Sequence, residues 1–176
     1  MTAYTIDTSH SDISFSVRHM VFAKVRGHFG KWSATLAFDA AAPGKSSVEV
    51  SIDVASIDTR EAQRDGHLKS ADFFDAEKFP KITFKSKQVE AAGAGHYKVA
   101  GDLTMHGVTK GVTLDVEETG RGKDPWGNSR VGFVAKGSLV RADYGLKWNQ
   151  ALETGGVLVG EKVEIEIEVE AVEAKA

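Results

Sequence analysis

Cysteine is absent from this chain of 176 residues. Its absence excludes disulfide bonds, thiolate nucleophiles, and metal or iron–sulfur sites held by cysteine. Long apolar runs are also missing, and no stretch approaches the roughly 20 apolar residues that a membrane-spanning helix needs. The first residues, Met1 to Asp7, have neither the basic nor the apolar segment of an export signal. We therefore expect a cytoplasmic protein, unless a signal was removed before this numbering begins.

The chain also has no excess of positive charge, since it contains 22 Lys and Arg residues and 25 Asp and Glu residues. The basic residues are spread singly rather than clustered, which argues against binding to a nucleic-acid backbone. With 41% hydrophobic and 27% charged residues, the chain has the composition of a folded globule. We expect one domain over residues 1–176.

Helical periodicity is nearly absent, and alternation of apolar and polar residues takes its place. In the clearest case, Val163, Ile165, Ile167, Val169 and Ala171 alternate with Glu164, Glu166, Glu168 and Glu170. Alternation of this kind is typical of strands that bury one face and expose the other. It predicts eight strands, near residues 12–20, 23–38, 46–54, 81–90, 96–105, 108–119, 129–141 and 161–173. We expect an all-β fold in which one antiparallel sheet closes into an eight-stranded barrel, since closure removes the exposed edges.

One stretch, residues 58–70, favours a short helix. Asp58 or Thr59 is the expected cap, and Asp58 with Glu61 resembles a capping box. The helix precedes Phe73 and Phe74, so it is expected either to cover one mouth of the barrel or to be a plain surface connection.

The second predicted strand changes the parity of its apolar residues. Val25 and Phe29 have odd numbers, whereas Trp32 and Phe38 have even ones. A β-bulge at Gly30 would keep both sets on the same face of the sheet.

The interior of an eight-stranded barrel is either filled by side chains or holds a small ligand. Gly101, Ala135 and Gly137 lie at inward positions and reduce the side-chain volume there, which favours a cavity. Glycines are also found where strands bend, so this alternative stays open.

Two polar residues, His19 and Arg141, share the inward parity. They are either rim residues, with Arg141 pairing with a carboxylate such as Asp143, or polar contacts for a ligand inside the barrel. Arg64 and His67 of the predicted helix are expected at the same mouth.

Metal and catalytic patterns are weak. His10, His19 and His28 recur every nine residues, but an odd interval on a strand alternates faces. Asp65, His67 and Ser70 can be drawn as a triad only with difficulty, because no nucleophile-elbow motif accompanies them. We predict no metal site and no catalytic residue.

Several ordered blocks resemble the YceI-like polyisoprenoid-binding family. They include Arg-Asp-Gly-His-Leu-Lys-Ser-Ala-Asp-Phe-Phe-Asp at 64–75 and Gly-Asp-Leu-Thr-Met-His-Gly-Val-Thr-Lys at 101–110. Further blocks lie at 4–20, 25–29, 79–86, 124–128 and 141–149. The resemblance implies a lipocalin-like barrel around an elongated apolar tunnel, often in a homodimer. It implies a long isoprenoid ligand, such as a polyprenyl phosphate, a polyprenyl alcohol or an isoprenoid quinone, and a binding rather than an enzymatic role.

The resemblance also implies which positions surround the tunnel: Phe15, His19, Phe29, Phe74, Phe84, Leu103, Phe133, Arg141 and Trp148. Inward parity and the predicted helix add Val17, Met105, Leu139, Arg64 and His67. The bound lipid is the only ligand expected, with no separate cofactor. Two alternatives remain: an enzyme that acts on an isoprenoid head group through His19, Arg64 and His67, and a barrel for another apolar cofactor such as haem, with His19 as its ligand.

Overall fold

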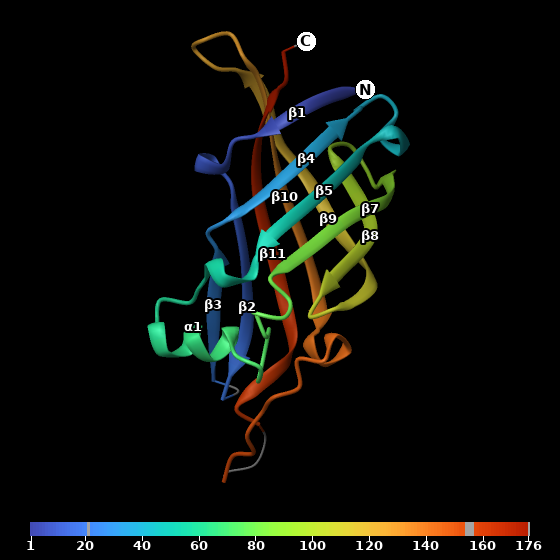
Figure 1. Cartoon of the computed structure of the whole chain (residues 1–176). Helices are drawn as coiled ribbons and strands as arrows, with labels where there is room; N and C mark the ends of the chain where they lie inside the picture. The colour runs from blue at the N-terminus through green and yellow to red at the C-terminus, as the bar shows by residue number, and fades with distance from the viewer. Residues whose placement is uncertain (21, 154–156, 176) are drawn as a thin grey trace.

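The computed structural model describes residues 1–20, 22–153 and 157–175, and these form a strand-rich molecule with one α-helix (Figure 1). The strands are β1 (Thr2–Ile6), β2 (Asp12–His19), β3 (Ala23–Phe29), β4 (Trp32–Phe38), β5 (Ser47–Asp53), β6 (Ile57–Asp58), β7 (Lys81–Ala91), β8 (His96–Met105), β9 (Val108–Lys123), β10 (Ser129–Val140) and β11 (Val159–Glu173). The helix is α1 (Ala62–Lys69), and short 3₁₀ turns are η1 (Thr8–His10), η2 (Pro43–Lys45), η3 (Val54–Ser56) and η4 (Arg141–Tyr144). None of the described helices has the length and apolarity to cross a membrane.

Closure of the sheet depends on β1, which pairs with β4 on one side and with β11 on the other. The described strands thus form a closed antiparallel ring of eight, in the order β1, β4, β5, β7, β8, β9, β10, β11. Where β1 ends, β2 takes over the free edge of β11, and β3 and β6 continue the sheet from there. The eight-stranded barrel predicted from the sequence is confirmed.

The membership of the barrel differs from the prediction in three places. The predicted strand at 12–20, β2, lies beside β11 and outside the ring of eight. β1 was not predicted, and the expected strand at 23–38 is two strands, β3 and β4, separated at Gly30 and Lys31. An interruption of the strand at Gly30 and Lys31 therefore replaces the bulge expected at Gly30. The prediction that both sets of apolar residues share one face is confirmed, because Val25 and Phe29 of β3 line the same cavity as Trp32 and Phe38 of β4.

The alternation along β11 is also confirmed. Val163, Ile165, Ile167 and Val169 line the interior, while Glu164 and Glu166 stand on the outer face opposite Ser16 and Ser14 of β2. Apolar side chains thus face inward over most of the ring, and the carboxylates face water.

The helix begins later than predicted, at Ala62, and its cap is Glu61. The Glu61 carboxylate accepts hydrogen bonds from the backbone N–H groups of Gln63 and Arg64, at 3.1 and 2.6 Å. The expected caps are engaged elsewhere: the Asp58 carboxylate accepts from the Arg60 backbone N–H at 2.8 Å, and Thr59 is bonded to Asp65. The Asp58 side chain therefore stabilises a local turn instead of capping the helix.

The segment from residue 59 to 80, which contains α1, covers a gap in the sheet. β6 pairs only with β3, and β7 pairs with β5 from Lys81 onward, so the described strands leave the space between β6 and β7 unbridged. Leu68, Phe73 and Phe74 of this segment line the interior. The segment is thus a lid that forms part of the wall, and the interpretation as a plain surface connection is wrong.

Two of the glycines expected to open the interior do not do so. A Cβ atom on Gly101 would overlap the carbonyl oxygen of Lys85 and the ring of Phe84, and one on Gly137 would lie 2.7 Å from Cδ2 of Leu114. Atoms of neighbouring strands occupy the space that a side chain at these two positions would need, because the sheet is closely packed there. Of the three predicted small positions, only Ala135 lines the cavity.

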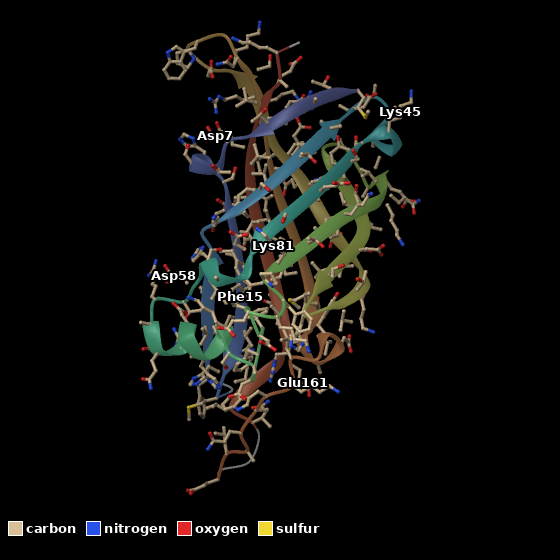
Figure 2. The ribbon with its side chains drawn as sticks, viewed as in Figure 1. Asp7, Phe15, Lys45, Asp58, Lys81 and Glu161 are labelled. Carbon is tan, nitrogen blue, oxygen red and sulfur yellow. The ribbon has the colours of Figure 1, made fainter. Side chains whose placement is uncertain are left out.

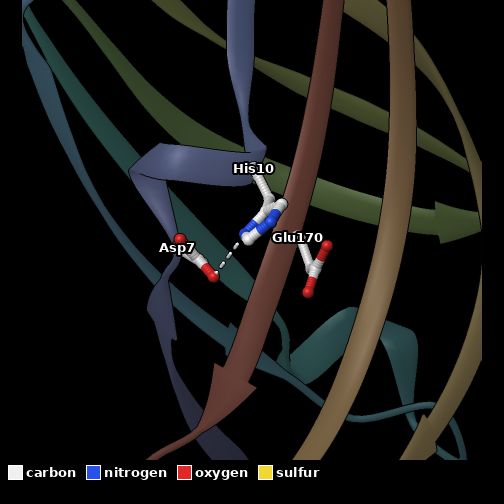
Figure 3. Close-up of side chains that lie close together, drawn as sticks. All are labelled: Asp7, His10 and Glu170. Atoms are coloured by element: carbon white, nitrogen blue, oxygen red, sulfur yellow. Dashed lines mark hydrogen bonds and ion pairs between the residues drawn. The ribbon is translucent and has the colours of Figure 1, made fainter. Parts of the chain in front are cut away.

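An ionic network of Arg130, Asp7, His10 and Glu170 fixes the corner where β1 turns into β2, and Figure 3 shows the last three of these residues. The Nη1 atom of Arg130 lies 2.9 Å from Oδ2 of Asp7 and 2.7 Å from Oε1 of Glu170, and His10 Nδ1 lies 2.9 Å from the same Asp7 oxygen. Asp7, His10 and Glu170 have ligand atoms close enough for a metal ion. The guanidinium of Arg130 already supplies the positive charge, so we assign a structural role to this cluster.

We predict that Gly101→Ala lowers the free energy of unfolding by about 1–3 kcal/mol, because the backbone carbonyl of Lys85 cannot move aside as a flexible side chain would. Gly111→Ala on β9 is the matched control, since no atom lies within 4 Å of its Cβ position. Urea unfolding of both variants measures the difference. Equal stability of the two variants would contradict the packing described for β7 and β8.

We predict that the stabilising effect of Asp7 is greatest between pH 4 and pH 6.5. Hydrogen bonds from Ser9, His10 and Arg130 lower the pKa of Asp7 from its usual 3.8, so its contribution is lost as the pH falls below that value. The hydrogen bond to Asp7 raises the pKa of His10 from 6.5, so that contribution is lost as the pH rises through the raised pKa.

The stability difference between the wild type and Asp7→Asn, followed against pH by chemical unfolding, should therefore decline on both sides of this window. His10→Gln is the control, because it should remove the decline on the alkaline side only. A difference that does not vary with pH would show that these pKa shifts do not arise from the folded corner.

Candidate functional site

The interior of the barrel is an elongated cavity of about 410 Å³. It extends from Phe38 and Tyr97, at the end closed by β1, to His67 and Trp148 at the α1 end. Figure 2 shows Phe15 on the ribbon of β2, inside the outline of the barrel and above the level of α1. The wall is largely aliphatic and aromatic, which suits a long apolar ligand.

The end of the cavity near β1 is packed with aromatic rings. The ring of Phe38 meets those of Tyr97 and Phe133 edge-on, with centroids 5.5 and 5.1 Å apart. All three side chains are buried. Edge-to-face contacts of this kind hold rings in fixed orientations, so this cluster is a firm boundary of the cavity.

A second row of rings lies nearer the lid. Phe15 and Phe29 have centroids 5.6 Å apart, and Phe29 meets Phe74 of the lid at 6.3 Å. Gly27 makes this row possible, because a Cβ atom there would overlap the Phe15 ring. The lid is therefore connected through its Phe74 side chain to the wall formed by β2 and β3.

The outer part of the lid is fastened to the segment that precedes β11. The ring of His67 lies edge-on to Trp148 at 4.7 Å and to Phe73 at 5.1 Å. His67 Nε2 is 2.8 Å from the carboxylate of Asp72. This imidazole is thus in contact with two aromatic rings, and its Nε2 atom with a carboxylate.

Arg141 has only 5% of its surface exposed, and its partners are backbone carbonyl oxygens. Nε donates to Gly160 at 2.8 Å, Nη1 to Leu146 and Trp148 at 2.6 and 2.9 Å, and Nη2 to Val159 at 3.3 Å. These bonds engage four of the five N–H groups of a guanidinium. Arg141 therefore ties the segment carrying Trp148 to the start of β11.

The charge of Arg141 has no carboxylate partner in the part of the chain that the structure describes. The rim interpretation is wrong, because the side chain is buried and Asp143, on the same 3₁₀ turn, is exposed. Burial lowers the pKa of the Arg141 guanidinium, and the charge of Glu161 partly opposes that effect. An arginine remains cationic after such a shift, so the cavity end near the lid contains a buried positive charge.

The other charged side chains on the wall are those of Arg18 and Arg64, both basic, and the wall also carries the hydroxyl groups of Ser14, Ser46, Ser47 and Thr59. Arg64 donates from Nε to Oγ1 of Thr59 at 2.8 Å and from Nη2 to the Thr59 carbonyl at 2.7 Å. His19, half-buried at the end of β2, lines the cavity as well. Among the described lining residues there is no Asp or Glu, so the fixed charges of the wall are all positive.

All fourteen positions predicted from the sequence lie on the wall of this one cavity: Phe15, Val17, His19, Phe29, Arg64, His67, Phe74, Phe84, Leu103, Met105, Phe133, Leu139, Arg141 and Trp148. That they contact a ligand stays a prediction. Sequence reasoning missed Thr59, Phe73 and Leu146 as wall residues. Phe73 carried a usable signal, since it adjoins Phe74 in the same sequence block. Leu146 carried the same signal, since it lies in the block at 141–149 with Arg141 and Trp148. Thr59 carried none, because non-local folding alone brings it to the wall.

The weak catalytic and metal patterns do not assemble. His10 is bonded to Asp7, His28 to Asp12, and His19 lines the cavity, so the three histidines do not converge. In the imagined triad, the His67 ring is bonded to Asp72 and the Ser70 hydroxyl donates to the backbone carbonyl of His67. Asp65 instead accepts hydrogen bonds from Thr59.

Comparison with known proteins places this architecture in a family. The family model described as YceI-like domain matches residues 4–171. A UPF0312 protein of Staphylococcus aureus is 40% identical over 171 residues, which cover 97% of each chain.

Among solved structures, Burkholderia cenocepacia BcnA aligns with a TM-score of 0.83 at 27% identity, over 94% of this chain and 98% of the other. A polyisoprenoid binding domain from Saccharophagus degradans has a TM-score of 0.67 at 16% identity, over 99% and 100%, and so shares the fold. With a family model matched from Tyr4 to Ala171 on a closed lipocalin-like barrel, the chain belongs to the YceI-like domain family.

Proposed function

We propose that this protein binds and carries a long isoprenoid lipid, with the tail inside the barrel and the head group at the α1 end. The observation that carries the proposal is the elongated cavity, whose wall is largely apolar, has basic groups near the lid and includes no acidic residue in the described part of the chain. The polyisoprenoid binding domain of S. degradans shares the fold, which supports the same class of ligand.

The energetics of tail burial suit this class. Each buried methylene contributes about 0.8 kcal/mol, so one five-carbon isoprenoid unit gives roughly 4 kcal/mol before costs are subtracted. Two or three such units offset an association cost on the order of 10 kcal/mol. Affinity can therefore come from the tail, which leaves the lid end free to select the head group.

The charges at the lid end favour an anionic head group. Arg141 and Arg64 line the cavity, and no acidic residue does so within the described part of the chain. A phosphate or diphosphate would relieve the uncompensated charge of Arg141, whereas an alcohol or a quinone carries no charge to do this. Polyprenyl phosphates are therefore the proposed ligands in preference to the neutral isoprenoids.

A binding role, without turnover, is supported by how the polar groups are already engaged. Arg141 is bonded to backbone carbonyls, Arg64 to Thr59, and the His67 ring to Asp72. Of these three groups, only Arg64 contacts a hydroxyl, and that hydroxyl of Thr59 is itself bonded to the Asp65 carboxylate. The arrangement suits holding a head group in place rather than transferring a proton or a phosphoryl group.

We predict that Ala135→Phe lowers the affinity for a polyprenyl lipid at least tenfold, because the added ring would occupy the tail's path. The matched control is Val134→Phe, one residue earlier on β10, where the side chain points to the other face of the sheet and is not on the cavity wall. Displacement of a fluorescent fatty-acid probe by a polyprenyl phosphate measures both. Unchanged affinity in Ala135→Phe, with the fold intact by circular dichroism, would count against the tail site.

We predict that Arg64→Gln weakens binding of a polyprenyl phosphate by about 10- to 100-fold, the range expected for a lost hydrogen bond to a charged group. Binding of the matching polyprenol should change little, because it has no charge. Arg60→Gln is the control, since Arg60 is exposed just before the helix and does not line the cavity. Titration of each variant with both lipids provides the comparison. An equal loss for alcohol and phosphate would contradict selection by charge.

A further inference from the structure

Three large apolar side chains are exposed together near the lid end of the barrel. Phe22 is 88% exposed, Met20 39% and Val157 43%. Met20 and Val157 are neighbours in space, because the Met20 backbone N–H donates to the Leu158 carbonyl at 2.8 Å. Met20, Phe22 and Val157 are called the mouth patch here. Exposed apolar clusters on a folded protein mark contact with another molecule or with a membrane.

The mouth patch continues the apolar lining of the cavity to the outside. His19, which precedes Met20, and Leu158, which follows Val157, both line the cavity. In Figure 1 the tip joining β2 to β3 and the segment leading into β11 lie at the same end as α1, at the bottom of the view. A tail that leaves the cavity at this end would therefore emerge beside the patch.

Basic residues surround the tip of β2 and β3. Arg18, Lys24 and Arg26 are the charged residues of the sequence from 18 to 26, and no acidic residue lies among them. Lys24 contacts Glu164 at 3.3 Å, and the charge of Arg18 helps to lower the pKa of the same carboxyl, whereas Arg26 forms no ion pair in the part of the chain that the structure describes. An anionic bilayer has a negatively charged surface above an apolar interior. Cations that flank an apolar tip can contact the surface while the tip enters the apolar layer.

We infer that the mouth patch docks this end of the barrel on an anionic lipid bilayer. Phe22 and Met20 enter the interface, and Arg18 and Arg26 contact lipid phosphates. The lid and the cavity mouth then face the membrane from which the lipid is taken. This inference rests on the proposed function, because it supplies the route between bilayer and cavity.

The test is sedimentation of the full chain with vesicles of phosphatidylcholine, either alone or with phosphatidylglycerol. The double variant Met20→Ser/Phe22→Ser is compared with Trp126→Ser. Trp126 is 80% exposed in the turn between β9 and β10, at the other end of the barrel (Figure 1). The expected result is binding to the phosphatidylglycerol vesicles that falls at least fivefold in the double variant, falls with added salt, and is unchanged in Trp126→Ser.

A second measurement separates the docking surface from the cavity. The double variant should bind a polyprenyl phosphate offered in detergent micelles as the wild type does, but should extract it from vesicles at least fivefold more slowly. Equal vesicle binding by the wild type and the double variant would overturn the inference. So would a dimer in analytical ultracentrifugation that the double substitution dissociates, when the wild type shows no vesicle binding. Vesicle binding without any micellar lipid uptake would overturn the proposed function and leave the docking surface standing.

Discussion

The pairing of β1 with both β4 and β11 is the constraint on which this structure depends. It turns an open sheet into a ring, so that inward side chains of eight strands share one interior. Because β1 spans only Thr2–Ile6, it closes the ring at one end, and the other end is completed by β2, β3 and the lid. The barrel is therefore sealed by backbone hydrogen bonds at its aromatic end and by side-chain packing at its lid end. Packing contacts open at a lower cost than a strand ladder, so the lid end is where we expect the proposed ligand to enter.

Arg141 connects this architecture to the proposed ligand. Its guanidinium ties the segment with Trp148 to the start of β11 through four backbone carbonyls, and Trp148 in turn contacts His67 of the lid. The same group places an uncompensated positive charge on the cavity wall. A ligand phosphate near Arg141 would thus act on the element that holds the lid. Tail burial supplies the bulk of the affinity in this view, and the lid end supplies the discrimination.

The barrel and the cavity wall could be predicted from the sequence because alternation is a local signal. Every strand with four or more apolar residues of one parity was found, and residues of that parity line the cavity. β1 was missed because it is five residues long and is stabilised by partners 30 or more residues away, β4 and β11. Gly101 and Gly137 were misinterpreted because the side chains that fill their space, Phe84 and Leu114, come from neighbouring strands. The carbonyl partners of Arg141 and the cap at Glu61 likewise depend on tertiary packing and on competing turns, which no periodicity records.

The central claim is that the interior is a hollow apolar site for a lipid tail. The most direct measurement is a crystal structure of the protein after incubation with a polyprenyl phosphate, together with native mass spectrometry of the same sample. The account predicts one bound lipid per chain, with continuous tail density from the Phe38 cluster to Phe15 and the phosphate beside Arg64 and Arg141. An interior filled by its own side chains, with the protein lipid-free in the mass spectrum, would contradict it.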